Sequence, residues 1–294
     1  MLSFVPTSSD RSTHLHASDM AAVLGVDPYK TAAELALEKL EHKGLREKKL
    51  NDSMRLGIHF EEAIGELYSA ETGKVIEATG LTYSCQQEGY DFLVGTPDFL
   101  VSCELAAMDA KHVGSRMAHH WGRDGDKIAP YMLPQMHSYN LILDLDYCDV
   151  AAIIGGYGPF LFHVERSSAW DDLLLEHAQR FWDLIKRGEI PDINVDHPTS
   201  LDLLKKIYPG TNGRTIDLPD KLIDIVAERA RAKKYITELE KHVKSCDTII
   251  AESMADSAVG KLSNGTIITR SQVSRKGYAV DPKSFIQTTI RVPK

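Results

Sequence analysis

Three side chains between residues 98 and 111 have the types and spacing that metal-assisted hydrolysis of a phosphodiester requires. Ten residues separate Asp98 from Asp109, and Lys111 follows two positions later. If residues 105–113 form a strand, Asp109 and Lys111 point to the same face, because side chains alternate along a strand. Asp98 is then expected at the edge of the neighbouring strand, facing the same place. Two carboxylates bind a hard divalent cation such as Mg²⁺, and an ammonium group beside it positions or deprotonates a water.

Each part of this pattern has an ordinary structural explanation when it is taken alone. A proline followed by Asp98 is common in turns, and Asp109 with Lys111 is typical of a surface salt bridge on a strand. Glu61 makes that explanation the minor one, because the flanking strands are too apolar to hold three unpaired charges without a function. Glu62 is adjacent to Glu61 on an expected helix, so one of the two faces solvent, and Glu62 is the fallback.

The composition is that of a globular protein and bounds its partners. The chain has 294 residues, of which 43% are hydrophobic and 26% charged, and its net charge is −8. This charge counts mildly against a general basic coat for nucleic acid, but not against a basic channel inside an acidic molecule. The four cysteines are scattered without a CxxC pair, so neither a zinc ribbon nor an iron–sulfur site is expected.

Membrane association and secretion are not expected. No stretch approaches the roughly 20 apolar residues that span a bilayer. The N-terminal residues lack the charged and apolar regions of a signal peptide. We therefore expect a cytoplasmic protein without a membrane partner.

The order of expected elements predicts an α/β fold with a mixed sheet. A capping-box pattern at Thr31 opens a helix that runs to about Leu40, and Asn51 or Asp52 caps a second helix that ends at Gly73. Further expected elements, in chain order, are strands at 81–85, 92–101 and 105–113, a helix at 129–143, strands at 148–155 and 160–165, and a helix at 169–187. This order is typical of a sheet covered by helices.

The C-terminal part is expected to be a separate extension. Apolar residues recur at three- and four-residue steps and predict the packing seam of a long helix: Ile236, Leu239, Val243, Cys246 and Ile250. We expect residues 220–233 to form the partner helix of a helical hairpin, with an interaction surface as the minority alternative. Asn264-Gly265 predicts a small β-hairpin. The predicted division is a core at 1–192, a connecting segment at 193–219 and an extension at 220–294.

Several motifs occur in the order found in one nuclease family. They are residues 17–25 (ASDMAAVLG), Gly57 to Glu61 with Tyr68 and Thr72-Gly73, residues 95–98 (GTPD), residues 109–111 (DAK), the helix with Tyr131, Gln135 and His137, residues 153–156 (IIGG), and residues 160–166 with Phe181-Trp182. Over residues 11–192 the chain resembles the lambda-exonuclease-like (YqaJ-type) viral recombinases of the PD-(D/E)xK superfamily. The resemblance implies the restriction-endonuclease-like core of that superfamily.

The resemblance also implies a catalytic centre of Glu61, Asp98, Asp109 and Lys111, with Gln135 orienting either the attacking water or Lys111. Asp98 is expected to bridge two Mg²⁺ ions, with Mn²⁺ as the alternative metal. Asp109 and the carbonyl of Ala110 complete one metal shell, and Glu61 serves the other. Lys111 steers the water and offsets charge on the phosphorane. The family more often has Glu where Asp109 stands, so metal preference can differ.

A pocket for a terminal 5′-phosphate is implied at Arg11, Ser18 and Thr96. Arg11 precedes Ser18 by the family's spacing, and Thr96 stands where a serine is usual. An arginine with hydroxyl donors suits a phosphate dianion. For Ser18 the alternative is a helix N-cap, and for Arg11 it is a solvated surface residue.

The resemblance thus implies a Mg²⁺-dependent 5′–3′ exonuclease of double-stranded DNA in phage-type single-strand-annealing recombination. The family further implies a homotrimeric ring around DNA, a single-strand DNA annealing protein as partner, and, for a phage-encoded chain, action in the host cytoplasm. Two alternatives stay open. One is a RecB-like or CRISPR-adaptation nuclease, which the scattered cysteines disfavour. The other is a noncatalytic DNA-binding recombination scaffold.

Overall fold

The computed structural model describes residues 4–5, 11, 13–41, 52–122 and 126–274. It divides the chain into two compact units, Met1–Ile207 and Tyr208–Lys294. The boundary after Ile207 falls inside the expected connecting segment. The division into 1–192, 193–219 and 220–294 stays a prediction.

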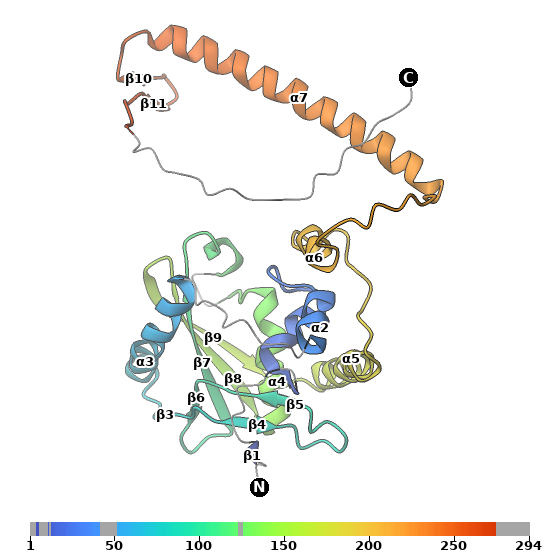
Figure 1. Cartoon of the computed structure of the whole chain (residues 1–294). Helices are drawn as coiled ribbons and strands as arrows, with labels where there is room; N and C mark the ends of the chain where they lie inside the picture. The colour runs from blue at the N-terminus through green and yellow to red at the C-terminus, as the bar shows by residue number, and fades with distance from the viewer. Residues whose placement is uncertain (1–3, 6–10, 12, 42–51, 123–125, 275–294) are drawn as a thin grey trace. The chain divides into compact units, whose positions relative to one another are not determined.

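A mixed five-stranded sheet forms the centre of the first unit (Figure 1). Its strand order is β3 (Ile76–Ala78), β6 (Phe99–Val101), β7 (Ala106–Val113), β8 (Tyr147–Ile154) and β9 (Tyr157–Glu165). β7 and β8 run parallel over their full length, whereas the other neighbours are antiparallel. The sheet confirms the predicted mixed α/β class.

Helices cover both faces of this sheet, because its central strands are apolar on both sides. α3 (Asp52–Thr72) buries Ile64 and Tyr68 against Met108 and Ala151. α4 (Leu133–Leu143) and α5 (Ser168–Arg187) pack on the other face. Val150 and Ala152 of β8 face these two helices, whereas Ala151 between them faces α3. Ala107 of β7 belongs to the core on the α4 side. Because side chains alternate along a strand, Asp109 and Lys111, two and four positions further on, face the same side.

A smaller four-stranded sheet lies beside the central one, in the order β1 (Phe4–Val5), β4 (Thr82–Ser84), β5 (Leu93–Gly95) and β2 (Leu15–His16). The strand predicted at 92–101 is therefore wrong as a single element. It is two strands, β5 in the small sheet and β6 in the central sheet. The break occurs at Thr96-Pro97-Asp98, because a proline lacks the N–H that a continuous strand would use. This break carries Asp98 across to the central sheet.

Short helices complete the first unit. Thr31 caps α2 (Ala32–Leu40) as predicted, since its hydroxyl accepts a hydrogen bond from the Glu34 N–H. Gly188 ends α5 with a φ of 73°. The remaining elements are η1 (Ala17–Asp19), α1 (Met20–Val23), η2 (Ala118–His120), η3 (Pro130–Met132) and α6 (Ser200–Ile207).

The second unit corrects one prediction and bears out another. α7 (Lys221–Met254) is a single helix of 34 residues, so the expected helical hairpin is wrong. The physical reason is local: residues 220–236 contain neither Gly nor Pro, and nothing ends the helix before the seam. The predicted β-hairpin is present, with β10 (Val259–Lys261) antiparallel to β11 (Ile267–Thr269) and Gly265 at a φ of 86°. Across the described ranges, no helix is both long and apolar enough to cross a bilayer.

Candidate active site

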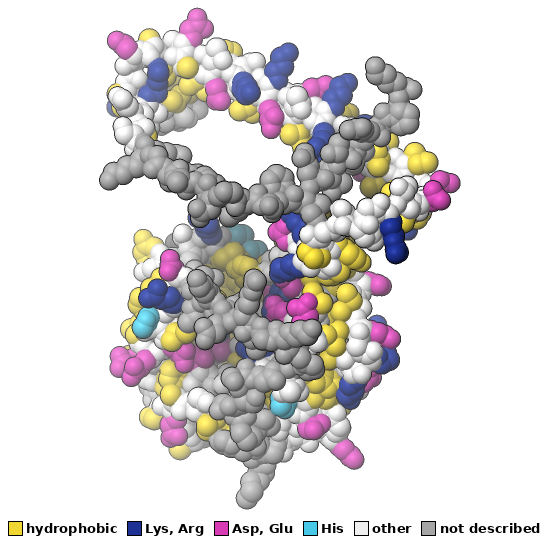
Figure 2. All heavy atoms as spheres, viewed as in Figure 1, with side chains coloured by type: hydrophobic (Ala, Val, Ile, Leu, Met, Phe, Trp, Pro, Cys, Tyr) yellow, Lys and Arg dark blue, Asp and Glu magenta, His cyan; other side chains and the backbone are white. Residues whose placement is uncertain are grey.

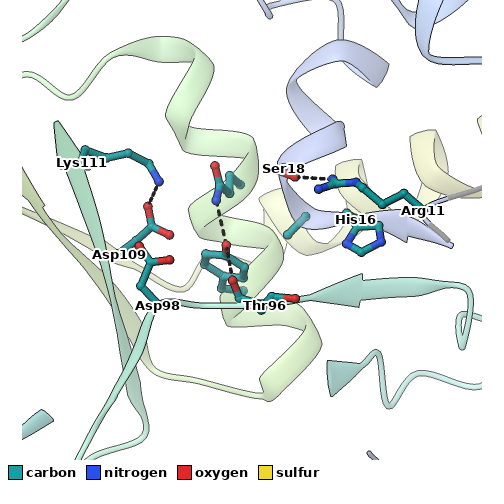
Figure 3. Close-up of a pocket in the computed structure, with 10 residues that line it drawn as sticks. Arg11, His16, Ser18, Thr96, Asp98, Asp109 and Lys111 are labelled. Atoms are coloured by element: carbon teal, nitrogen blue, oxygen red, sulfur yellow. Dashed lines mark hydrogen bonds and ion pairs between the residues drawn. The ribbon is translucent and has the colours of Figure 1, made fainter. Parts of the chain in front are cut away.

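A polar pocket of about 180 Å³ opens where three parts of the first unit meet (Figure 3). β7, the break between β5 and β6, and α4 form its inner wall. The segment from residue 11 through β2 and η1 forms its outer wall. It is lined by Arg11, His16, Ala17, Ser18, Thr96, Asp98, Asp109, Lys111, Gln135 and Tyr139. Of the predicted catalytic and phosphate-binding side chains, all but Glu61 line this one pocket.

The inner wall holds two carboxylates and one ammonium group. Asp109 is 1% exposed and forms an ion pair through Oδ2 with Nζ of Lys111, two positions along β7. The N–H of Ala110, which lies between them, donates to Oδ2 of Asp98 at 2.8 Å. This bond fixes the Asp98 carboxylate against β7, so Asp98, Asp109 and Lys111 lie together in the pocket, and their catalytic roles stay predictions.

The charges of these groups perturb one another. Burial, and then the neighbouring Asp109 carboxylate, raises the pKa of Asp98 to about 7, while Lys111 and the Ala110 N–H partly offset the rise. Burial opposes the charge of Lys111, but Asp109 and Asp98 outweigh it and raise the pKa of the ammonium. Lys111 therefore carries its proton near neutral pH. It is suited to positioning a water and stabilising negative charge rather than to removing a proton.

The chemistry of this inner wall fits a divalent cation. Neither oxygen of the buried Asp109 accepts a hydrogen bond from a described residue, which leaves the ion pair with Lys111 as its compensation. Two carboxylates and one ammonium leave an excess of negative charge in a buried place. Mg²⁺ binds through one or two carboxylates and keeps several waters, so Asp98, Asp109 and the Ala110 carbonyl suffice for one ion.

Glu61 stands apart from this set. It lies on α3, which packs on the other face of β7, and it does not line the pocket. Its charge raises the pKa of Asp98 less than burial or the Asp109 carboxylate does. Among the described residues, no three acidic, His or Cys side chains are grouped to hold a metal. The role of Glu61 at a second ion stays a prediction.

The outer wall carries the expected phosphate-binding groups. Nη2 of Arg11 donates to Oγ of Ser18 at 2.9 Å, and the Arg11 side chain is 52% exposed. Thr96 shares a hydroxyl–hydroxyl hydrogen bond of 2.9 Å with Thr82. The alternative interpretation of Ser18 as a helix N-cap is wrong, since Ser18 lies inside η1 and His16 holds the cap position.

A buried ion pair that we did not anticipate anchors this outer wall. Lys39 of α2 is 3% exposed, and its Nζ donates to the carbonyls of Arg11 (3.0 Å) and His14 (2.7 Å) and to Oδ2 of Asp19 (2.9 Å). Burial opposes the charge of Asp19, but Lys39 and Arg11 outweigh it and lower the pKa of that carboxyl. A buried lysine 28 positions from its acceptor has no signature in the sequence.

Two further lining residues escaped the sequence reasoning. Burial, followed by the charge of Arg11, lowers the pKa of His16 to about 4, so this imidazole is neutral near pH 7. Tyr139 belongs to the core and is 3% exposed, but it also lines the pocket. It accepts from Nε2 of Gln135 at 2.7 Å and donates to the carbonyl of Thr96 at 3.0 Å. The four-residue spacing between Gln135 and Tyr139 was the available signal, since it places both on one helix face.

The fold is a mixed sheet covered by helices, and one known family matches the part of the chain that contributes every lining residue of the pocket. Residues 8–143 match the YqaJ-like viral recombinase domain. The resemblance that we drew from the ordered motifs is confirmed by this match.

Solved structures share the fold. The alkaline exonuclease LHK-Exo from Laribacter hongkongensis is similar with a TM-score of 0.51 and 16% identity, over 67% of this chain and 94% of that chain. LHK-Exo in complex with dAMP gives a TM-score of 0.50 and 18% identity over the same shares. At such identities the likeness concerns the fold alone. A search of the curated proteins gave no match.

Proposed function

We propose that the protein is a Mg²⁺-dependent exonuclease that degrades one strand of double-stranded DNA from its 5′ end, in phage-type single-strand-annealing recombination. One observation carries the proposal: a single pocket holds a cation-binding set on one wall and a phosphate-binding set on the other. An enzyme that removes terminal nucleotides needs both sets in one cavity, because the terminal phosphate and the cut bond belong to neighbouring positions of one strand. The LHK-Exo fold supports an exonuclease.

Each side chain has a role in this proposal. The guanidinium of Arg11, with the hydroxyls of Ser18 and Thr96, donates to a terminal phosphate dianion. Lys111 donates to the scissile phosphate or to the attacking water, and its positive charge offsets the charge that develops on the phosphorane. Gln135 presents its carbonyl oxygen to the same water, because its amide nitrogen is engaged by Tyr139.

Asp98, Asp109 and the Ala110 carbonyl would hold the cation. A divalent ion there supplies Lewis-acid activation of the phosphate and lowers the pKa of a bound water. Mg²⁺ is the expected ion and Mn²⁺ the alternative. A second ion bound with the help of Glu61 belongs to the proposal as well.

The wider setting follows from the family resemblance. We propose that three copies form a ring through which DNA passes, and that the surviving strand is handed to a single-strand annealing protein. For a phage-encoded chain the site of action is the host cytoplasm.

The proposal is tested with purified protein and linear duplexes labelled at either 5′ or 3′ ends, with and without a 5′-phosphate. Mg²⁺, Mn²⁺ and a chelator are compared, and a covalently closed circle is included. We expect mononucleotides from 5′-phosphorylated ends with Mg²⁺ and none with the chelator. Release from 3′ ends would overturn the polarity, and cutting of the circle would indicate an endonuclease.

A pair of lysine variants separates catalysis from DNA binding. Lys111→Ala is expected to lower single-turnover cleavage roughly 100- to 1,000-fold, the usual loss when a transition-state donor is removed. The matched control is Lys205→Ala, whose side chain forms an exposed ion pair with Asp202 on α6. Equal activity of the two variants, or absence of degradation by the unaltered protein, would favour the noncatalytic scaffold.

A further inference from the structure

The long helix α7 exposes a continuous apolar seam. The seam consists of Ile236, Leu239, Val243, Cys246 and Ile250, and continues toward the N-terminus through Ala232, Ile225 and Leu222 with Arg229 as the single charged member. Its large side chains face solvent: Ile236 is 55% exposed, Leu239 65% and Val243 57%. Figure 2 shows hydrophobic side chains along α7 among acidic and basic ones. Such a repeat of three and four steps is the pattern of a coiled coil.

Within the described residues of the second unit, nothing covers this seam. Met254, which contacts the β-hairpin at Gly260, is the only buried residue on α7. A helix in water takes most of its stability from packing one face against a partner. The 34 residues of α7 extend about 50 Å at 1.5 Å per residue. We therefore expect a helix of this length with an exposed apolar seam to pack against a partner helix.

A groove on α7 has the form of a coiled-coil socket. It is lined by Ile236, Leu239, Glu240, Val243, Lys244 and Asp247. With Ile236 at heptad position a, the residues Ile236, Leu239, Glu240 and Val243 occupy positions a, d, e and the next a. These four positions make the hole that receives a d-position side chain from a parallel, in-register helix. The side chain at that height on a second copy is Leu239 itself.

The charges beside the seam fit a second copy of α7. Glu228 occupies position g and Lys233 occupies position e, five residues later. In a parallel pair, g of one helix lies beside the following e of the other, so Glu228 and Lys233 form two symmetric ion pairs between copies. His242 and Asp247 repeat this relationship two heptads further along the helix.

The residue types in the seam select the number of strands. Ile236, Val243 and Ile250 are β-branched and occupy position a, and Leu239 occupies position d. β-Branched residues at a with leucine at d favour two strands in a parallel coiled coil. At the N-terminal end of the seam, Leu222 at a and Ile225 at d are the combination that favours more strands, so the half from Ile236 to Ile250 is the part that fits one partner helix.

We propose that α7 pairs with α7 of a second copy of this chain as a parallel, in-register, two-stranded coiled coil. The association lies in the second unit and uses no residue of the candidate active site, so it stands or falls independently of the nuclease proposal.

Cys246 at a d position provides a direct test. In a parallel pair the two Cys246 side chains lie opposite each other, close enough for a disulfide. The chain is prepared as Cys103→Ser, which leaves Cys246 as its exposed thiol because Cys85 and Cys148 are buried. Mild oxidation is expected to give a covalent dimer on a non-reducing gel. The control Cys103→Ser/Cys246→Ser should give none, and adding Leu239→Asp to Cys103→Ser should abolish the dimer although Cys246 is present.

Sedimentation velocity on the full chain tests the same interface without forming a disulfide. Leu239→Asp is expected to remove the association through α7, so the sedimenting mass falls to that of one chain, or to that of one ring if the proposed ring of three copies forms through other contacts. Glu228→Lys places a second positive charge beside Lys233 of the other copy and should weaken association about tenfold. The double variant Glu228→Lys/Lys233→Glu restores the opposite charges and should restore the affinity.

Circular dichroism establishes that each variant is helical, and the rescue by the double variant remains informative if Leu239→Asp loses structure. An unaltered chain without self-association through α7, a disulfide that survives Leu239→Asp, or a charge swap without rescue would overturn the proposal. A three-stranded assembly through α7 would overturn the two-stranded form.

Discussion

The amide of Gln135 donates through Nε2 to the hydroxyl of Tyr139 at 2.7 Å, and that hydroxyl donates in turn to the carbonyl of Thr96 at 3.0 Å. The hydroxyl has a single proton, so its donation to Thr96 leaves it able only to accept from Gln135. The donor end of Gln135 is therefore turned toward Tyr139, and its carbonyl oxygen is left for the pocket. In the proposed mechanism Tyr139 is therefore a positioning residue that acts through Gln135.

Tyr139→Phe is expected to lower the rate of DNA cleavage about three- to tenfold, the worth of one hydrogen bond, because the Gln135 amide can then turn over. The affinity for DNA should change little, which separates orientation from binding. A double variant with Gln135→Ala should be no slower than Gln135→Ala alone. Additive losses in single-turnover rates would mean that Tyr139 does not work through Gln135.

The stability of the protein without divalent cations should fall as the pH rises from about 4 to about 7. The pKa of Asp98 is about 7 in the folded chain and ordinarily 3.8, so the folded state binds more protons than the unfolded state between these values. Protonation of Asp98 therefore contributes roughly 2–4 kcal/mol to the free energy of unfolding below about pH 4, and this contribution is lost above about pH 7. Denaturant unfolding in a chelator at pH 5 and pH 8 measures it.

Asp98→Asn is the control for this pH dependence, since an amide does not titrate. The variant should lose the difference in stability between pH 5 and pH 8 that the unaltered chain shows. Mg²⁺ should act in the opposite sense, because the ion competes with the proton for the carboxylates, and its stabilising effect should grow with pH. If Asp98→Asn leaves the difference between pH 5 and pH 8 unchanged, the effect belongs to other groups.

Arg11→Lys should reduce the preference for a 5′-phosphate without affecting stability. A lysine keeps the charge but cannot reproduce the forked donors of a guanidinium, so cleavage of 5′-phosphorylated DNA should slow about tenfold or more, as expected when a charged hydrogen bond is lost. Cleavage of the 5′-hydroxyl duplex should be unchanged, and so should the melting temperature, because the side chain is 52% exposed. Equal slowing on both duplexes would show that Arg11 does not recognise the terminal phosphate.

Lys39→Met should destabilise the protein by about 3–5 kcal/mol, as when one partner of a buried ion pair is removed. The substitution leaves the Asp19 carboxylate and the carbonyls of Arg11 and His14 without their shared donor. Denaturant unfolding measures the loss. Asp19→Asn/Lys39→Met, which removes both charges, should recover part of it. A loss below about 1 kcal/mol for Lys39→Met would show that the pair does not hold this segment.

Local patterns in the sequence were sufficient to predict several elements of the fold and one part of the site. Alternation along β7 put Asp109 and Lys111 on one face, the Thr31 cap started α2, and Asn264-Gly265 marked the β-hairpin. These predictions held because each depends on residues a few positions apart, where backbone geometry leaves few choices. The ordered motifs indicated the family whose model matches residues 8–143.

Tertiary structure alone decided the rest. Lys39 reaches the carbonyl of Arg11 across 28 positions, the Tyr139 hydroxyl bonds to Thr96 across 43, and Glu61 lies outside the pocket. The heptad seam on α7 predicts that a partner helix exists, but not that the preceding residues would continue the same helix instead of folding back. Contacts between distant positions depend on how whole elements pack, and a single sequence records the faces of those elements without their relative placement.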